Sequence, residues 1–442
     1  MTIEVVTRRQ SFSRRCWTML TRPWGVFALS AISVVYLAAL LLSTQRHFNG
    51  ADFANYYVYA LGMRKGLNVY TTDLSSLAAS IGLDMGYWSW GTYPPTFILC
   101  FEPLSLLSPR AAWWVWAALN VALLSVGLWL LLNDGFDLAS GLVLGALAIL
   151  YAPLTIHFHF AQAQILILTL LILAVHSIRR GREVAAGSSL ALAILLKVYP
   201  LLLVGYLVVR RRWSVLLYTG LTFGIGLGVT CAFVGVDRTV AFPHAISTLT
   251  QQVGLPNNVS VASMISRAFW HFFSRSNSLA DHARRAAVLA SSLGVLILTM
   301  WATFNFHGEV DENDPAFALW VVAMVLLSPT AWVHYLVLLL LPFGLLAEAA
   351  NRGRASWCAI WFGIASYALA EALMVGEFRS LWRIPESLAA CISALAPLCL
   401  ILAYLSSYFL LSDEGIRLDK VIRQPGKEEG VDNRAITVGI SR

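Results

Sequence analysis

Residues 25–43 read GVFALSAISVVYLAALLLS and contain no charged side chain. A helix needs about 20 apolar residues to cross the hydrocarbon layer of a bilayer, so this run predicts a membrane-spanning helix. The run is longer than the apolar core of a secretory signal peptide, and it lacks a small-residue cleavage site. We therefore expect residues 25–43 to be retained as the first membrane helix.

The rest of the chain has the same apolar character. Of its 442 residues, 58% are hydrophobic and 12% are charged, with a mean hydropathy of +0.69. Soluble domains carry about 25% charged residues, so an ordinary water-soluble fold is excluded. No polar block long enough for a soluble domain separates the further apolar runs. These runs are 111–132, 141–155, 162–178, 214–235, 286–306, 316–330, 332–349, 356–376 and 386–411.

Two apolar segments are interrupted. Residues 184–210 contain Lys197-Val198-Tyr199-Pro200, and because proline removes a helical hydrogen bond, we expect two short helices that meet there. Residues 96–108 are too short to span and contain Glu102 and Pro103. They predict a re-entrant or interfacial segment.

Arginine clusters indicate how the chain is oriented. Short loops rich in Lys and Arg stay on the cytoplasmic side, so all of these clusters are expected there. The chain then crosses about twelve times, as one all-α polytopic domain over residues 25–411 with re-entrant segments. The tails 1–24 and 412–442 are cytoplasmic, the second one disordered, and loops 44–95 and 236–285 face outward. The clusters are the N-terminal arginines, 179–182, 210–212 and 352–354.

The same clusters account for the net charge of +7, so nucleic-acid binding is not indicated. The six cysteines show no metal-ligand spacing, and His157 and His159, expected on one side of an extended segment, have no third ligand nearby. No phosphate-binding loop or dinucleotide fingerprint occurs. We therefore predict neither a metal nor another cofactor.

Asp52 is the first candidate for chemistry. It lies shortly after the first predicted helix, at the membrane–water boundary, where a base acting on a lipid-borne substrate must sit. The alternative is a helix N-cap, because aspartate is a favoured cap and residues 56–63 look amphipathic. The two roles are compatible.

Three cationic or titratable side chains are candidates for binding an anion. Lys197 lies in a strongly apolar stretch, where it either holds a lipid phosphate or reaches the interface as an anchor. His334 lies between two apolar runs and is either a donor to a phosphate or sugar hydroxyl or a structural histidine. The guanidinium of Arg267 suits a phosphate, with an ordinary loop arginine as the alternative.

Six short blocks occur in a recognisable order between residue 50 and about residue 340. They are Asp52-Phe53 with Tyr56-Tyr57 and Gly66…Tyr70; Tyr93-Pro94-Pro95; Gln162; Ala186-Gly187 leading to Lys197 and Pro200; Asn258…Ser260 with Arg267; and Leu327-Ser328-Pro329…Trp332…His334-Tyr335. In this order they resemble the polyprenol-phosphate-mannose-dependent α-mannosyltransferases of glycosyltransferase family 87. These are integral membrane enzymes of the GT-C type.

The resemblance implies an inverting transfer of mannose from a polyprenyl-phosphate donor to a lipid or glycan acceptor, without a metal. It implies a site on the outer or periplasmic face of a bacterial cytoplasmic membrane. Asp52 matches the catalytic carboxylate, and Lys197, Arg267 and His334 match polar positions near the donor phosphate. The implied substrate-binding residues are Tyr56, Tyr57, Tyr93, Gln162 and Asn258.

The sequence departs from the family pattern at several positions. Ala161 stands where Gly is usual, Gln164 stands for Asn, Val259 stands for Gln, and the usual Pro before Tyr70 is missing. Related members use arabinofuranose, so a polyprenyl-linked arabinofuranosyltransferase is an alternative. A lipid or sugar transporter or flippase is another, although the internal repeats typical of transporters are not seen. A structural envelope subunit would leave Asp52 and Lys197 unexplained.

Overall fold

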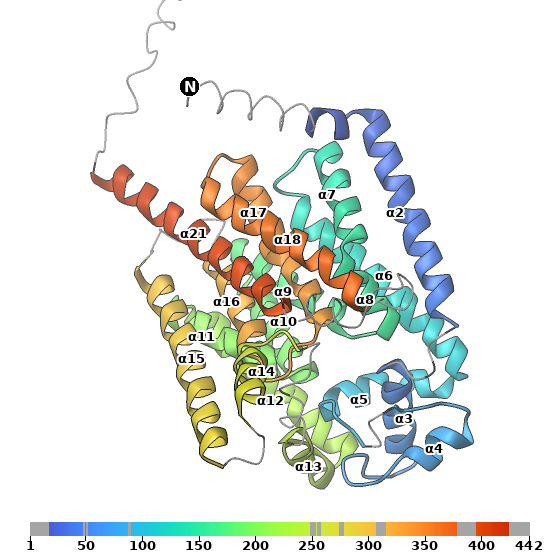
Figure 1. Cartoon of the computed structure of the whole chain (residues 1–442). Helices are drawn as coiled ribbons and strands as arrows, with labels where there is room; N and C mark the ends of the chain where they lie inside the picture. Colours follow the sequence, from blue (N-terminus) through green and yellow to red (C-terminus); the bar gives the residue numbers. More distant parts are fainter. Residues whose placement is uncertain are drawn as a thin grey trace, which may run out of the picture.

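A computed structural model describes residues 17–46, 49, 52–86, 90–247, 253, 258–273, 278–305, 315–377 and 395–423. These residues form helices joined by short turns, with no strand beyond one isolated bridge (Figure 1). The helices are α2 (Pro23–Thr44), α3 (Asp52–Arg64), α4 (Ser75–Ser80), α5 (Pro95–Phe101), η1 (Glu102–Leu106), α6 (Pro109–Leu132), α7 (Leu138–Leu150), α8 (Ala152–Phe160), α9 (Gln164–Arg179), α10 (Glu183–Leu196), η2 (Tyr199–Leu202), α11 (Leu203–Val209), α12 (Trp213–Val234), α13 (Val236–Ser247), α14 (Val261–Phe272), α15 (Ser278–Asn305), α16 (Pro315–Leu327), η4 (Val333–Leu339), α17 (Leu340–Asn351), α18 (Trp357–Glu377) and α21 (Ala396–Arg423).

The predicted all-helical membrane class is confirmed. In the described part of the chain, five helical segments are long and apolar enough to cross a membrane, namely α2, α6, α12, α15 and η4 with α17. A sixth results if α7 and α8 count as one bent span, and seven further apolar helices have 10–17 residues. These lengths do not confirm the expected count of about twelve crossings.

The predicted single helix over 141–155 is two helices. α7 and α8 meet at an angle of 53°, with the break at Tyr151 and Pro153 near the start of α8. Because proline lacks an amide hydrogen and clashes with the preceding turn, the chain bends there. His157 and His159, expected on an extended segment, lie in α8 instead, where His157 is fully buried.

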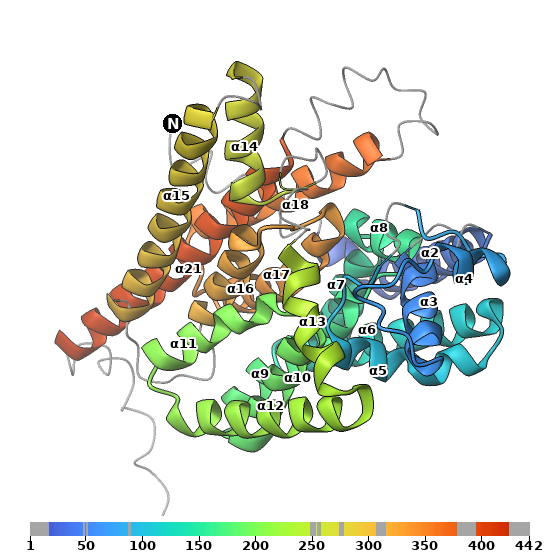
Figure 2. The same cartoon turned by 90° about the horizontal axis from the view of Figure 1, so that it is seen from below.

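The hairpin of α9 and α10 lies in the middle of the molecule, between the group of α3, α4 and α5 and the group of α15 and α21 (Figures 1 and 2). Gly187 lets α10 pack closely on α12, since a Cβ atom there would lie 2.7 Å from the Val215 carbonyl oxygen. α10 ends at Leu196, and Lys197 takes an extended conformation before η2. The predicted break in 184–210 is therefore confirmed.

The loop 44–95 is folded rather than open. It contains α3, whose residues 53–63 are all buried, because α5 and η1 pack against it. The amphipathic character predicted for residues 56–63 is therefore wrong, because this segment has no exposed face. Asp52 is the first residue of α3 and is partly exposed. Its carboxylate therefore lies at the partly exposed N-terminal end of an otherwise buried helix.

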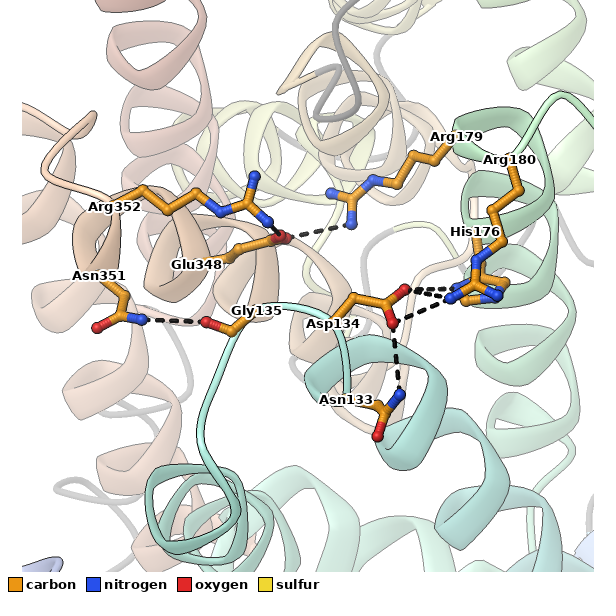
Figure 3. Close-up of polar contacts among 9 residues, drawn as sticks. All are labelled: Asn133, Asp134, Gly135, His176, Arg179, Arg180, Glu348, Asn351 and Arg352. Carbon is orange, nitrogen blue, oxygen red and sulfur yellow. Dashed lines mark hydrogen bonds and ion pairs between the residues drawn. The ribbon is translucent and has the colours of Figure 1, made fainter. Parts of the chain in front are cut away.

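At the C-terminal end of α9 an ion-pair network joins this helix to α17 (Figure 3). Glu348, only 2% exposed, binds Arg179 at 3.1 Å and Arg352 at 2.8 Å. A Cβ atom at Gly135 would lie 2.8 Å from Glu348 Cγ, so the turn between α6 and α7 passes directly over this carboxylate. Asn351 Nδ2 donates to the Gly135 carbonyl at 3.0 Å and fixes that turn.

A more exposed pair lies beside the network. Asp134 binds Arg180 at 2.7 Å, and His176 lies 3.8 Å from the same carboxylate. Both Asp134 and Arg180 are 43% exposed, so this pair is solvated, whereas the Glu348 carboxylate is only 2% exposed. Helices α6, α9 and α17 are thus tied together at the end remote from Asp52.

The expected C-terminal boundary at residue 411 falls inside a helix, because α21 continues to Arg423. Parts of the helix predicted over 386–411 and of both predicted tails lie outside the described residues. So do parts of the loops 44–95 and 236–285.

Candidate active site

Asp52 is held by two amides from different parts of the fold. Gln162 Nε2 donates a hydrogen bond to Asp52 Oδ2, and the Asn55 side chain, one turn further along α3, bonds the same carboxylate. Gln162 is 1% exposed, whereas Asp52 is only partly buried. The carboxylate is therefore oriented by the protein and still accessible on one side.

Gln162 also connects Asp52 to a cation. Its Oε1 accepts hydrogen bonds from Tyr56 at 3.1 Å and from Tyr93 at 3.4 Å, and the two tyrosine hydroxyls lie 2.7 Å apart. Lys197 Nζ donates to the Tyr93 hydroxyl at 3.3 Å. One continuous hydrogen-bond chain thus leads from the carboxylate to the ammonium group.

Lys197 is 6% exposed and lies between two aromatic faces. Its Nζ is 4.6 Å from the ring centroid of Tyr93 and 5.0 Å from that of Tyr335. Within the described part of the chain it forms no ion pair, so its charge is stabilised by ring faces and one hydroxyl. A buried cation in that situation is ready to bind an anion.

The environment changes the acidity of Asp52, which lies outside the candidate membrane spans. Burial is the largest influence and raises the pKa of Asp52 from 3.8 to about 6, against the opposing effects of Lys197, Asn55 and Gln162. A carboxylate with this pKa is still ionised at neutral pH. It is also a stronger base than an ordinary aspartate, as general base catalysis requires.

An aromatic cluster supports the tyrosines. The ring of Tyr56 lies 4.6 Å from that of Tyr93, 4.9 Å from Phe97 and 5.6 Å from Phe101, each in edge-to-face geometry. Trp116 closes the cluster, with its ring 5.1 Å from Phe101. Such pairs add about 0.5–1.5 kcal/mol each beyond area burial, so the hydroxyls of Tyr56 and Tyr93 have little freedom to move.

The turn between α8 and α9 places Gln162. Ala161 ends α8 with φ of 50°, in the left-handed region, and Gln162 N then donates to the His157 carbonyl at 3.0 Å. Trp116 Nε1 donates to the Ala161 carbonyl at 2.9 Å and holds the turn from the α6 side. The left-handed conformation explains why glycine is usual at residue 161, because only glycine adopts it without strain.

Asn258 joins two of the short sequence blocks. It forms an antiparallel bridge with Trp332, its Nδ2 donates to the Pro329 carbonyl at 3.0 Å, and its Oδ1 accepts from Ala331 N at 3.2 Å. Ser260, bonded to the Asn258 side chain, caps α14. The contacts of Asn258 are thus with backbone, and they fix the segment that leads into His334.

His334 is 7% exposed, and its Nε2 is buried without a hydrogen-bond partner among the described residues. Its ring centroid lies 5.1 Å from that of Tyr335, whose ring borders Lys197. His334 and Lys197 are close enough to interact electrostatically. The structure therefore brings Asp52, Tyr56, Tyr93, Gln162, Lys197 and His334 into one centre.

Two predicted site residues are not joined to this centre by the contacts above. The Tyr57 hydroxyl donates to the Leu107 carbonyl at 2.7 Å and so anchors α3 to the end of η1. Arg267 lies half-buried on α14. Their roles stay predictions.

Four residues of the centre were not assigned a role from the sequence. Trp116 was not named, Tyr335 appeared only as part of a block, Gln164 only as a departure, and Tyr199 only beside the proline break. The Tyr199 hydroxyl donates to Gln164 Oε1 at 3.4 Å, and its ring lies 5.2 Å from that of Tyr335. The sequence signal that could have identified Gln164 and Tyr199 is the occurrence of their polar groups in an apolar stretch.

The model of glycosyltransferase family 87 matches residues 92–329, which include Tyr93, Gln162 and Lys197 but not Asp52 or His334. A polyprenol-phosphate-mannose-dependent alpha-(1-2)-phosphatidylinositol mannoside mannosyltransferase of Mycolicibacterium smegmatis is 26% identical over 383 residues, covering 80% of this chain and 81% of that protein.

A protein of the same name from Mycobacterium tuberculosis is 25% identical over 282 residues, covering 59% of this chain and 61% of that protein. No solved structure matches this chain at a comparable level of significance. The family match covers more than half of the chain and agrees with the order of the short blocks. The chain therefore belongs to glycosyltransferase family 87 and is a glycosyltransferase.

Proposed function

We propose that this protein transfers mannose from a polyprenyl-phosphate donor to a lipid acceptor of the phosphatidylinositol mannoside type, at the outer face of the membrane. Both curated relatives carry that donor and acceptor class in their names. The observation that carries the proposal is the hydrogen-bond chain from Asp52 through Gln162 and Tyr93 to Lys197. It supplies a base and a cation in one centre.

In the proposed reaction an acceptor hydroxyl attacks the anomeric carbon of the donor, and its proton passes to the Asp52 carboxylate. The bond between the anomeric carbon and the phosphate oxygen breaks, and its electron pair leaves with the polyprenyl phosphate. Because attack and departure occur on opposite faces, the configuration inverts. A phosphate leaves without protonation, so cations that stabilise its charge suffice.

Lys197 is the proposed ligand of that phosphate, with His334 as a second donor and Arg267 as a further cation. Lys197 and Asp52 interact electrostatically but do not form an ion pair, because Tyr93 and Gln162 lie between them. Charges of opposite sign that are held apart can act on different ends of a neutral sugar. Tyr56, Tyr93 and Gln162 provide the polar groups beside it, and Asn258 positions the His334 segment.

The two ends of α9 support the proposed outward orientation. Gln164 starts the helix at the centre and Arg179 ends it in the arginine-rich network, about 22 Å away at about 1.5 Å per residue. Arginine clusters favour the cytoplasmic side, so the centre belongs to the opposite side. The remote position of the network thus supports an external site.

The test is transfer by the purified protein in lipid nanodiscs. Radiolabelled polyprenyl-phosphate mannose and a phosphatidylinositol mannoside acceptor should give a labelled lipid product whose new linkage has the configuration opposite to that of the donor. Polyprenyl-phosphate arabinofuranose serves as the competing donor. Transfer of arabinose alone, or retention of configuration, would contradict the proposal.

A further inference from the structure

The start of α9 is an unusual helix end. The residue before it is Ala163, whose side chain cannot cap the helix. Ala163 and Gln164 are both fully buried. The first-turn amide groups of a helix have no partner within the helix and carry partial positive charge, so a buried, uncapped end favours an anion.

A second observation at this end is an unused donor. The side chain of Gln164 is fully buried, its Oε1 accepts from Tyr199 at 3.4 Å, and its Nε2 has no hydrogen-bond partner among the described residues. Buried amide donors are nearly always paired in native proteins. An unpaired one in an enzyme centre therefore indicates a group that binds there.

Gln164 and Lys197 lie around the same tyrosine. The Gln164 side chain lies beside Tyr335, and the ring of Tyr335 lies 5.0 Å from Lys197 Nζ. The oxygen of the Gln164 amide accepts a hydrogen bond from Tyr199, which follows Lys197 by two residues. The free amide donor, the helix end and the ammonium group are thus brought together by two tyrosines.

We propose that the first turn of α9, with Gln164 Nε2 and Lys197, binds the phosphate of the polyprenyl carrier, so that Gln164 is a direct ligand of the leaving group. This rests on the proposed use of a polyprenyl-phosphate donor. Gln162 bonds the base and Gln164, two residues later, bonds the phosphate. The single turn from α8 to α9 therefore holds the two reacting groups on either side of the sugar.

The probe for this proposal is a short-chain polyprenyl monophosphate without sugar, titrated against the protein in nanodiscs. Gln164→Glu keeps the size and the acceptor for Tyr199 but places a negative charge beside the phosphate, and it should weaken binding at least tenfold. Gln164→Met removes the donor together with the acceptor for Tyr199, adds no charge, and should weaken binding several-fold. Asp52→Asn is the matched comparison, since it should abolish transfer and leave binding of the carrier phosphate within twofold.

The outcomes separate this inference from the proposed function. Carrier binding by both Gln164 variants equal to that of the wild type, with both variants folded by thermal unfolding, would overturn the role of Gln164 and leave the transfer reaction intact. If Gln164→Glu does not fold, Gln164→Met decides alone. Failure of the wild-type protein to bind the carrier would overturn both proposals, whereas carrier binding without mannose transfer would overturn only the donor sugar.

Discussion

Gln162 donates a hydrogen bond to Asp52 although 110 residues separate the two in the sequence. The carboxylate comes from the start of α3, and the amide comes from the turn that joins α8 to α9. The base proposed here is therefore oriented by a distant part of the chain. Its orientation and its ionisation can be tested separately.

Asp52→Asn is expected to lower turnover by a factor of about 10² to 10⁴, the usual contribution of a general base. In the wild type, turnover should rise with pH around a midpoint of about 6, because burial raises the pKa of Asp52 and only the carboxylate accepts a proton. The measurement is kcat between pH 5 and 8.

The control for this variant is stability. Burial disfavours the carboxylate, so the raised pKa means that ionisation of Asp52 opposes folding as the pH rises through about 6. Asp52→Asn removes that charge and should not lower the melting temperature at pH 7.5. A flat pH profile, or full turnover by the variant, would remove Asp52 from the mechanism.

Lys197→Met should weaken binding of a polyprenyl phosphate by about 10- to 100-fold, the value of one hydrogen bond to a charged group. Methionine fits between the rings of Tyr93 and Tyr335, so folding should be preserved. Binding is measured by titration in nanodiscs. Unfolding with unchanged affinity would instead identify Lys197 as a structural anchor.

The ion pairs at the remote end of α9 allow a matched comparison. Glu348→Ala leaves Arg179, which is 16% exposed, and the more exposed Arg352 without their shared carboxylate and should cost about 2 kcal/mol of stability. Asp134→Ala breaks the exposed pair with Arg180 and should cost less than about 1 kcal/mol. Equal losses of melting temperature would show that the Glu348 network is solvated.

The helix pair of α10 and α12 predicts a packing effect. An alanine Cβ at Gly187 would lie 2.7 Å from the Val215 carbonyl oxygen and 2.8 Å from the Thr219 amide nitrogen, which cannot move aside easily. Gly187→Ala should therefore cost about 1–3 kcal/mol. Gly220→Ala on α12, where nothing lies within 4 Å, should be neutral or stabilising. Thermal unfolding distinguishes the two variants.

The orientation of the protein in the membrane can be measured by labelling single-cysteine variants from which the native cysteines have been removed. Ser75→Cys, exposed at the start of α4, should react with an impermeant thiol reagent in intact cells. Glu183→Cys, exposed at the turn between α9 and α10, should react only after lysis. The reverse pattern would place the centre in the cytoplasm.

The sequence predicts helices well where apolar residues run uninterrupted. The run 25–43 corresponds to α2 at Pro23–Thr44, and the break at Lys197 was predicted because the proline at 200 removes a hydrogen bond. The full burial of α3 was missed, since it depends on α5 and η1 folding over it. Residue types predict local conformation. The burial of a helix under a distant segment depends on how the whole chain folds.

The centre was predicted in part. Asp52, Gln162 and Lys197 were named from short blocks, and their contacts depend on the left-handed conformation of Ala161, where alanine replaces the glycine that would have indicated it. Gln164 looked like a neutral replacement for asparagine. Its proposed role depends on the amide nitrogen, which is buried without a hydrogen-bond partner while the amide oxygen accepts from Tyr199.

The bridge between Asn258 and Trp332 has a consequence for how the enzyme matures during synthesis. A nascent chain that has inserted α2 through α12 already contains Asp52, Gln162 and Lys197, but it lacks the segment that Asn258 holds. Until Trp332 has left the ribosome, His334 is not positioned and Lys197 has only one of its two aromatic neighbours. A product of early termination would therefore contain Asp52, Gln162 and Lys197 but lack the ring of Tyr335 beside Lys197.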